Sequence, residues 1–342
     1  MVLVRRNIEE RWTALDAGKV LSDAGAGQRA EFDAFARQTP GIHPGYTSLS
    51  YIDPVLSNHD NRAVVRRSEH GMLSVHGSMQ WRRPSYNSLG GFLAGSPFVG
   101  PEPQGLCQSL AALLAGSRGA VRVPGVVPNG PMHEAIRSSF THRGFRVSNY
   151  APETIEMAYV HLQSDTGVRA SEAFLGGRSR NFRRSAERAQ KTCAAAGIRF
   201  EHAPADSDFD QLFSRICDVE SRSWKREADA GLFDLGLRSM MYRSCRALDR
   251  DGKLRVSFAK HDGRDVSYVL GAVVNGTYIG MQFSFDKEYA RYRLGDLGQL
   301  ETMDRVAAEG VREYSLGKIT DATQYKLRWA EELRTSLTVL IS

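Results

Sequence analysis

The strongest constraint on the fold comes from the segment between residues 254 and 285. Apolar and polar side chains alternate there with the period of strands that have one buried face. The alternating runs are 254–258, 266–270 and 278–285. Asp262-Gly263 separates the first two runs and Asn275-Gly276 the last two, and Asn-Gly is a strong signal for a type I′ hairpin turn. The sequence therefore predicts an antiparallel meander of three strands.

A glycine-punctuated helix start follows this meander. Gly295 and Gly298 precede apolar residues that recur at helical spacing up to Val306, and residues 311–316 form another strand-like run. A twisted sheet that leads into a glycine-rich first turn can hold an anionic group on backbone N–H groups. We therefore expect a phosphate-bearing ligand in this half of the chain.

Size and composition set broad limits. The chain has 342 residues, 42% of them hydrophobic and 25% charged, which favours a globular protein of two domains. No apolar run approaches the roughly 20 residues that span a bilayer, and the first residues lack the apolar core of a secretory signal. The four cysteines are widely spaced and fit a reducing cytoplasm. We therefore expect a cytoplasmic protein without membrane contact.

The net charge of +6 allows two interpretations. It can reflect an ordinary solvated basic surface, or a basic groove for CoA or nucleic acid. The histidines show no metal-ligand spacing, so we expect no metal site.

The rest of the chain reads as alternating helices and strands. Helical patterns lie at 8–15, 28–37, 106–114, 132–142, 172–195, 209–219 and 237–248. Strand-like runs lie at 62–66, 72–76, 120–123, 145–147, 154–162, 198–200 and 337–340. This order predicts an α/β (layered α+β) fold, with mixed, mostly antiparallel sheets flanked by helices. We place the domain boundary between residues 155 and 156.

Four motifs resemble those of a known family. They are Arg180-Asn181-Phe182-Arg183-Arg184, Glu220-Ser221-Arg222-Ser223-Trp224-Lys225, the stretch from Phe285 to Gly295, and Tyr325-Lys326-x-x-Trp329. Together with the strand order they resemble the GNAT N-acyltransferase superfamily, in particular its CelD/BcsL-like group, which is close to the FemABX peptidyltransferases. The resemblance covers about residues 45 to 335 and is specific in the second half. It implies two tandem GNAT-like domains, a degenerate one over 1–155 with a helical arm and a donor-binding one over 156–342.

The resemblance implies a site for an acyl donor, acyl-CoA or acetyl-CoA. In GNAT proteins the thioester lies between two splayed parallel strands, and the pyrophosphate lies on the turn that opens the next helix. Here Gly295 and Gly298 would let the backbone approach the phosphates, and Arg291 and Arg293 would add charge-assisted bonds. Asp296 departs from the family pattern. An anion beside a pyrophosphate is unfavourable, so Asp296 puts the binding of CoA in question. The alternative to a phosphate site is that Asp296 is the N-cap of the helix and the glycines only turn the chain.

Amine acylation needs a base near the acceptor. Glu220 is our candidate, because the neighbouring Trp224 could lower the local polarity; the alternative is a surface pair with Lys225 or Arg222. Tyr289 could protonate the leaving thiolate, a role that tyrosine has in GNAT enzymes, or it could serve packing.

Four further residues complete the candidate site. Lys326 could contact a carboxylate or phosphate, or support the fold by bonding a strand-end carbonyl. Asp286 follows the third strand of the meander, where a substrate would pass. Asp286, Trp224 and Tyr325 are candidates for substrate binding.

Three functions stay open. The first is an N-acyltransferase that uses acyl-CoA or another carrier thioester to acylate an amine of a small metabolite or sugar in biosynthesis. The second is a FemABX-like transferase that takes an aminoacyl group from tRNA. The basic helical stretch 178–191 favours it, although tRNA is the less favoured partner. The third is a non-catalytic GNAT-like binding protein. A homodimer is possible in each case.

Overall fold

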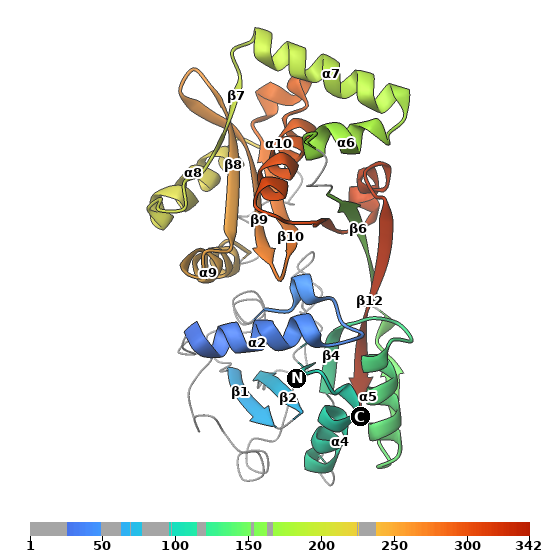
Figure 1. Ribbon diagram of the computed structural model, residues 1–342. Coiled ribbons are helices and arrows are strands. Elements are labelled where there is room, and N and C mark those ends of the chain that lie inside the picture. Colours follow the sequence, from blue (N-terminus) through green and yellow to red (C-terminus); the bar gives the residue numbers. More distant parts are fainter. Residues whose placement is uncertain are drawn as a thin grey trace. The chain divides into compact units, whose positions relative to one another are not determined.

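The computed structural model describes residues 26–48, 63–68, 70–76, 96, 98–114, 121–151, 154–162, 167–223, 225 and 237–342 (Figure 1). The helical pattern expected at 8–15 lies outside the described residues. The chain packs into two compact units. The first consists of Met1–Met157, Lys318–Gln324 and Leu333–Ser342, and the second of Ala158–Gly317 and Tyr325–Glu332. The predicted domain boundary after residue 155 stays a prediction.

The first unit has a small antiparallel sheet and a second group of strands. The small sheet has the order β1-β2-β3. The second group pairs β12 antiparallel with β4 and with β5. The bounds are β1 Ala63–Ser68, β2 Gly71–His76, β3 Phe98–Val99, β4 Val121–Val126, β5 Val147–Asn149 and β12 Glu332–Ile341.

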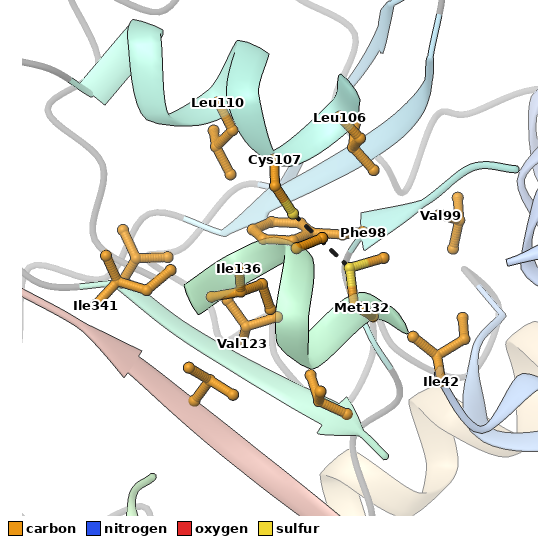
Figure 2. Close-up of a cluster of buried hydrophobic side chains, with 14 of the residues drawn as sticks. Ile42, Phe98, Val99, Leu106, Cys107, Leu110, Val123, Met132, Ile136 and Ile341 are labelled. Carbon is orange, nitrogen blue, oxygen red and sulfur yellow. Dashed lines mark hydrogen bonds between the residues drawn. The ribbon is translucent and has the colours of Figure 1, made fainter. Parts of the chain in front are cut away.

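Helices complete the first unit around an apolar core. The helices are α2 Ala26–Gln38, η2 Pro44–Tyr46, α4 Pro103–Leu114 and α5 Pro131–Thr141. The core lies where α4 and α5 meet the strands, and its centre is fully buried (Figure 2). There the Cys107 thiol lies 3.9 Å from the Met132 sulfur. Burial raises the pKa of the Cys107 thiol to about 12, so this cysteine acts as a core residue.

The second unit is built on one mixed sheet. Its strands have the order β6-β11-β10-β9-β8-β7. The bounds are β6 Ile155–His161, β7 Arg199–His202, β8 Leu254–His261, β9 Arg264–Val274, β10 Thr277–Phe285 and β11 Glu313–Lys318. Neighbouring strands from β7 to β10 are antiparallel, and β10 pairs parallel with β11. The predicted meander and the predicted fold class are confirmed.

Helices cover both faces of this sheet. On one face α10 (Leu294–Ala308) packs on β8, β9 and β10, and on the other α8 (Phe209–Ser221) packs on β9 and β10 (Figure 1). The two faces are told apart by neighbouring β9 residues: Tyr268 reaches Glu220 of α8, whereas Val269 faces Gly298 of α10. The remaining helices are α6 Ala170–Gly176, α7 Arg180–Ala195, α8 Phe209–Ser221, α9 Leu237–Arg250, α10 Leu294–Ala308, η6 Lys287–Tyr292 and η7 Asp321–Arg328.

The single helix predicted over residues 172–195 is wrong. The structure has two helices there, because α6 ends at Gly176 and α7 begins after Ser179. The Ser179 hydroxyl accepts a hydrogen bond from the Phe182 N–H, and such a cap starts a new helix. Arg178 therefore lies between the helices.

No helix among the described residues is long and apolar enough to cross a membrane.

Gly298 fixes how closely α10 approaches the sheet. A β-carbon placed on Gly298 would lie 2.7 Å from Cγ2 of Val269, so the missing side chain is what lets helix and strand touch. We expect Gly298→Ala to lower the free energy of unfolding by about 1–3 kcal/mol through overpacking. Gly176→Ala is the matched control, since a β-carbon at Gly176 meets no atom within 4 Å. Urea denaturation of both variants measures the difference, and equal stabilities would contradict this role of Gly298.

Candidate active site

The parallel strands β10 and β11 part in the middle of the sheet. Their paired register runs over three positions and ends at Ile279 and Ser315, although β10 continues to Phe285 and β11 to Lys318. A bulge in β10 between Gly280 and Gln282 lies directly after the last pair. Since a bulge bends the strand that carries it, β10 leaves the ladder with β11 at this point.

Beyond the bulge, the backbone of β10 offers polar groups to the open side. The Asp286 N–H donates to Val266 O of β9, and backbone groups of alternate residues point to the same side of a strand. The carbonyl of Phe283, an odd number of residues away, therefore points away from β9. It faces the side on which β11 has diverged.

Lys225 fills this open edge. Its Nζ donates a hydrogen bond to the Phe283 carbonyl and lies 5.1 Å from the centre of the Phe283 ring. The side chain is buried. Burial lowers the pKa of Lys225 to about 8, and nearby Glu220 partly opposes the shift. The sequence pointed to Lys225 only as a surface partner of Glu220, so its position at the open edge was missed.

Lys326 approaches the same place from η7. A β-carbon placed on Gly317, in β11, would lie 3.6 Å from Nζ of Lys326. Burial lowers the pKa of Lys326 to about 8, and the positive charge of Lys225 contributes to the shift. The ring of Tyr325 packs edge-on against Phe283, with centroids 6.2 Å apart. Tyr325 and Lys326, both predicted site residues, are thus brought together with Lys225.

Glu220 lies near the end of α8 and is only 1% exposed. The alternative of a surface ion pair is therefore wrong. Its Oε2 accepts a hydrogen bond of 2.8 Å from the Tyr268 hydroxyl. Burial, and then Glu220, raise the pKa of Tyr268, which keeps the phenol protonated and able to donate. The Glu220 carboxylate, held by Tyr268, thus lies close enough to Lys225 to raise the pKa of its ammonium group.

Asp286 is occupied by internal partners. Its carboxylate accepts from Arg222 Nε at 2.9 Å and from an Arg264 nitrogen at 3.2 Å, and it caps η6 through the Glu288 N–H. A buried carboxylate with these bonds fixes the exit of β10. Its predicted role in substrate binding stays a prediction.

Tyr289 contacts the end of β8. Its hydroxyl is 2.8 Å from Nδ1 of His261, at the end of β8. Desolvation raises the pKa of Tyr289. The structure therefore groups it with the β8–β9 turn, and its predicted role as a proton donor stays a prediction.

The first turn of α10 contains its own ion pair. Arg293 is the residue before the helix, with a left-handed φ of 54°, and Asp296 lies inside the first turn. The Asp296 carboxylate binds Arg293 through Nε at 2.8 Å and Arg328 at 3.2 Å. The alternative of Asp296 as the helix cap is therefore wrong, because its side chain joins two arginines.

The other predicted cofactor residues surround this turn. A β-carbon on Gly295 would lie 2.6 Å from the Phe283 ring, so Gly295, like Gly298, permits close packing on the sheet. Arg291 is exposed, and its guanidinium donates to the Tyr292 hydroxyl at 2.7 Å. Their predicted contacts with phosphate stay predictions.

The closing motif is anchored by its tryptophan. Trp329 is 1% exposed and stacks on Phe174 of α6, with Phe182 of α7 packed edge-on. Arg178, in the break between the two helices, donates to the carbonyls of Trp329 and Ala330. These contacts hold η7, and so Lys326, in place. The other predicted aromatic, Trp224, lies outside the described residues.

The exposed face of α7 is basic. Arg180, Arg184 and Arg188 lie one turn apart and are exposed, and Lys191 continues the stripe. Glu187 lies on the same face and offsets one of these charges. Arg328 adjoins the helix, with its guanidinium 5.8 Å from the centre of the Phe182 ring.

Among the residues with a described placement, no group of three or more His, Cys, Asp or Glu is arranged to hold a metal ion.

Comparisons with known proteins agree on the fold. Residues 180–327 match the family described as acetyltransferase (GNAT) domain. A conserved protein of unknown function from Bacteroides thetaiotaomicron is similar over 94% of this chain and 98% of its own, with 10% identity and a TM-score of 0.65. The crystal structure of FemX is similar over 91% of this chain and 95% of its own, with 12% identity and a TM-score of 0.63. No curated protein matches the sequence.

The two buried ammonium groups predict a pH-dependent stability. The pKa of Lys326 is lowered from 10.5 to about 8, so the unfolded chain binds more protons between these values, and wild-type stability rises with pH across this window. Lys326→Met removes this contribution. Between pH 8 and 10.5, we expect the wild type to gain up to about 3 kcal/mol of unfolding free energy that the variant does not gain. The unfolding free energy of the variant, relative to that of wild type, should therefore fall by this amount.

Urea denaturation at several pH values measures this difference. Lys260→Met gives the baseline for losing a half-exposed lysine, which pairs with Glu201 at 3.3 Å. If the difference in unfolding free energy between Lys326→Met and wild type does not change with pH, burial of the Lys326 ammonium group does not destabilise the folded protein.

Proposed function

We propose that the chain is an acyltransferase that forms amide bonds by transferring an acyl group to the amine of a small metabolite or sugar. The match of residues 180–327 to the family described as acetyltransferase (GNAT) domain supports the acyl transfer. The observation that supports this most is the parting of β10 from β11 beside Lys225, Lys326 and Glu220. In this proposal the acyl carbonyl would lie where the two strands part, next to Glu220 and the two lysines.

In the proposed step one bond forms at the acyl carbon and one breaks. The amine nitrogen attacks the acyl carbon, the new C–N bond forms, and the bond from carbon to the leaving sulfur or oxygen breaks. Glu220 accepts the proton that the amine loses, and the leaving group takes up a proton. Tyr289 is the predicted donor of that proton; its bond to His261 makes it part of a polar pair at the edge of the sheet.

Glu220 suits this role because it is held rather than free. The Tyr268 hydroxyl fixes one carboxylate oxygen, and burial keeps competing water away.

For the donor, we propose acyl-CoA or another carrier thioester. Asp296 argues less strongly against it than the sequence alone suggests, because the carboxylate is bound by Arg293 and Arg328. Two guanidinium groups and one carboxylate leave one positive charge at the start of α10, where a helix N-terminus also favours an anion. Arg291 would add to this charge.

A second donor, an aminoacyl-tRNA, is supported by one observation. The exposed stripe of Arg180, Arg184, Arg188 and Lys191 on α7 lies on the helix that adjoins Arg328. A row of basic side chains at one-turn spacing can follow a nucleic-acid backbone. A cytoplasmic location, a role in biosynthesis and a homodimer stay predictions.

Glu220→Gln tests the base. We expect turnover to fall at least about tenfold, because the amide cannot take up the proton. The measurement is amide formation, or release of free thiol, with a panel of amines. Glu172→Gln, on the exposed start of α6, is the matched control and should keep full turnover. An unchanged rate in Glu220→Gln, with intact fold, would remove Glu220 from the mechanism.

Binding measurements separate the two donors. Acetyl-CoA should raise the melting temperature if a CoA thioester is the donor. Under the alternative, tRNA binding should weaken steeply with salt, and the double variant Arg184→Glu, Arg188→Glu should reduce that salt dependence. Absence of thiol release, of CoA binding and of tRNA binding would contradict both and favour a non-catalytic binding protein.

A further inference from the structure

Two lysines from distant parts of the chain converge on the open edge of β10. We propose that Lys225 and Lys326 form a binding subsite for an anionic oxygen group, a carboxylate or a phosphate, carried by the amine acceptor. This inference rests on the proposed acyl transfer and narrows its acceptor to amines that also bear a negative charge.

The geometry defines where such a group would bind. The Nζ of Lys225 is fixed by the Phe283 carbonyl on the β10 side of the opening. Lys326 comes from η7 and lies close to Gly317 on the β11 side. The ring of Phe283 lies 5.1 Å from Nζ of Lys225 and 6.2 Å from the ring of Tyr325, the residue before Lys326, so both lysines adjoin the same part of β10. A single anion between them would receive hydrogen bonds from both sides.

The surroundings make an anion favourable there. Two like charges in a buried place repel each other and lose hydration, and an anion that binds both relieves the repulsion. The rings of Phe283 and Tyr325 form an apolar wall at 6.2 Å between centroids, which limits screening by water. A small charged oxygen group therefore gains more here than on the open surface.

The anion belongs to the acceptor rather than to the donor. Glu220, the proposed base for the acceptor amine, is the carboxylate that acts on Lys225. Ser284, next to Phe283 in β10 and opposite Tyr268 in register, has a buried hydroxyl without a hydrogen-bond partner among the described residues. An amine at this face could bond both Glu220 and Ser284. The phosphates of either proposed donor are instead expected at the start of α10 or along α7.

Paired acceptors test the inference by turnover. In the first pair, β-alanine carries a carboxylate where β-alaninamide carries a neutral carboxamide. In the second pair, phosphoethanolamine carries a phosphate that ethanolamine lacks. We expect wild type to prefer the charged member of one pair by about ten- to a hundredfold in kcat/KM, the worth of a charge-assisted hydrogen bond. Lys225→Met and Lys326→Met should lose this preference mainly through KM, while Lys225→Arg and Lys326→Arg should keep part of it. Lys260→Met should retain it in full.

A binding measurement does not depend on turnover or on a variant that folds. In wild-type protein with labelled lysine, NMR signals of the Lys225 and Lys326 side chains should shift on adding acetate or inorganic phosphate, at constant ionic strength. If the lysine NMR signals shift but no amine is acylated, the result supports the anion subsite and contradicts the proposed reaction. If charged and neutral amines are acylated at equal rates and the lysine NMR signals do not shift, the result supports the reaction and contradicts the subsite.

Discussion

The ladder of hydrogen bonds between β10 and β11 determines what the second unit can do. It lasts for three paired positions and ends at Ile279 and Ser315, where the bulge turns β10 aside. Backbone groups that would otherwise bind the neighbouring strand are then offered to other partners, and a buried polar group left without a partner costs free energy. Lys225 satisfies the Phe283 carbonyl, so the structural requirement of the open strand brings a cation to the place where an acyl group would lie.

The support for this opening comes from elements that are far away in sequence. Trp329, directly after η7, packs on Phe174 of α6 and Phe182 of α7, and these contacts anchor the end of η7 and help to hold Lys326. On the other face, Tyr268 of β9 holds Glu220 of α8. The close approach of α10 through Gly295 and Gly298 presses Phe283 and Val269 from the opposite side. Glu220 and the two lysines are therefore positioned by helices on both faces, so their geometry depends on the packing of the whole unit.

Much of this fold is predictable from the sequence because its signals are local. Alternation along β8, β9 and β10, and the turns at Asp262-Gly263 and Asn275-Gly276, need only neighbouring residues. The site is less predictable because its bonds join distant positions: Lys225 and Phe283 are 58 residues apart, and Arg328 and Asp296 are 32 apart. The break before α7 was missed for another reason. The apolar positions on both sides of Gly176-Gly177 fit one helical period, although the two glycines end α6 and the hydroxyl of Ser179 starts α7.

The buried lysines set stability against function. Burying an ammonium group costs free energy, and apolar residues of similar volume at such positions are often neutral or stabilising. For Lys225 and Lys326 that cost falls on the folded enzyme before any substrate binds, since each pKa is lowered to about 8 mainly by burial. In the proposed subsite, an anionic group of the acceptor would recover part of this cost when it binds, and the destabilising arrangement of the free protein would become affinity for the acceptor. A site of this kind favours ligands by charge, because a neutral group in the same space would leave the repulsion between the two lysines in place.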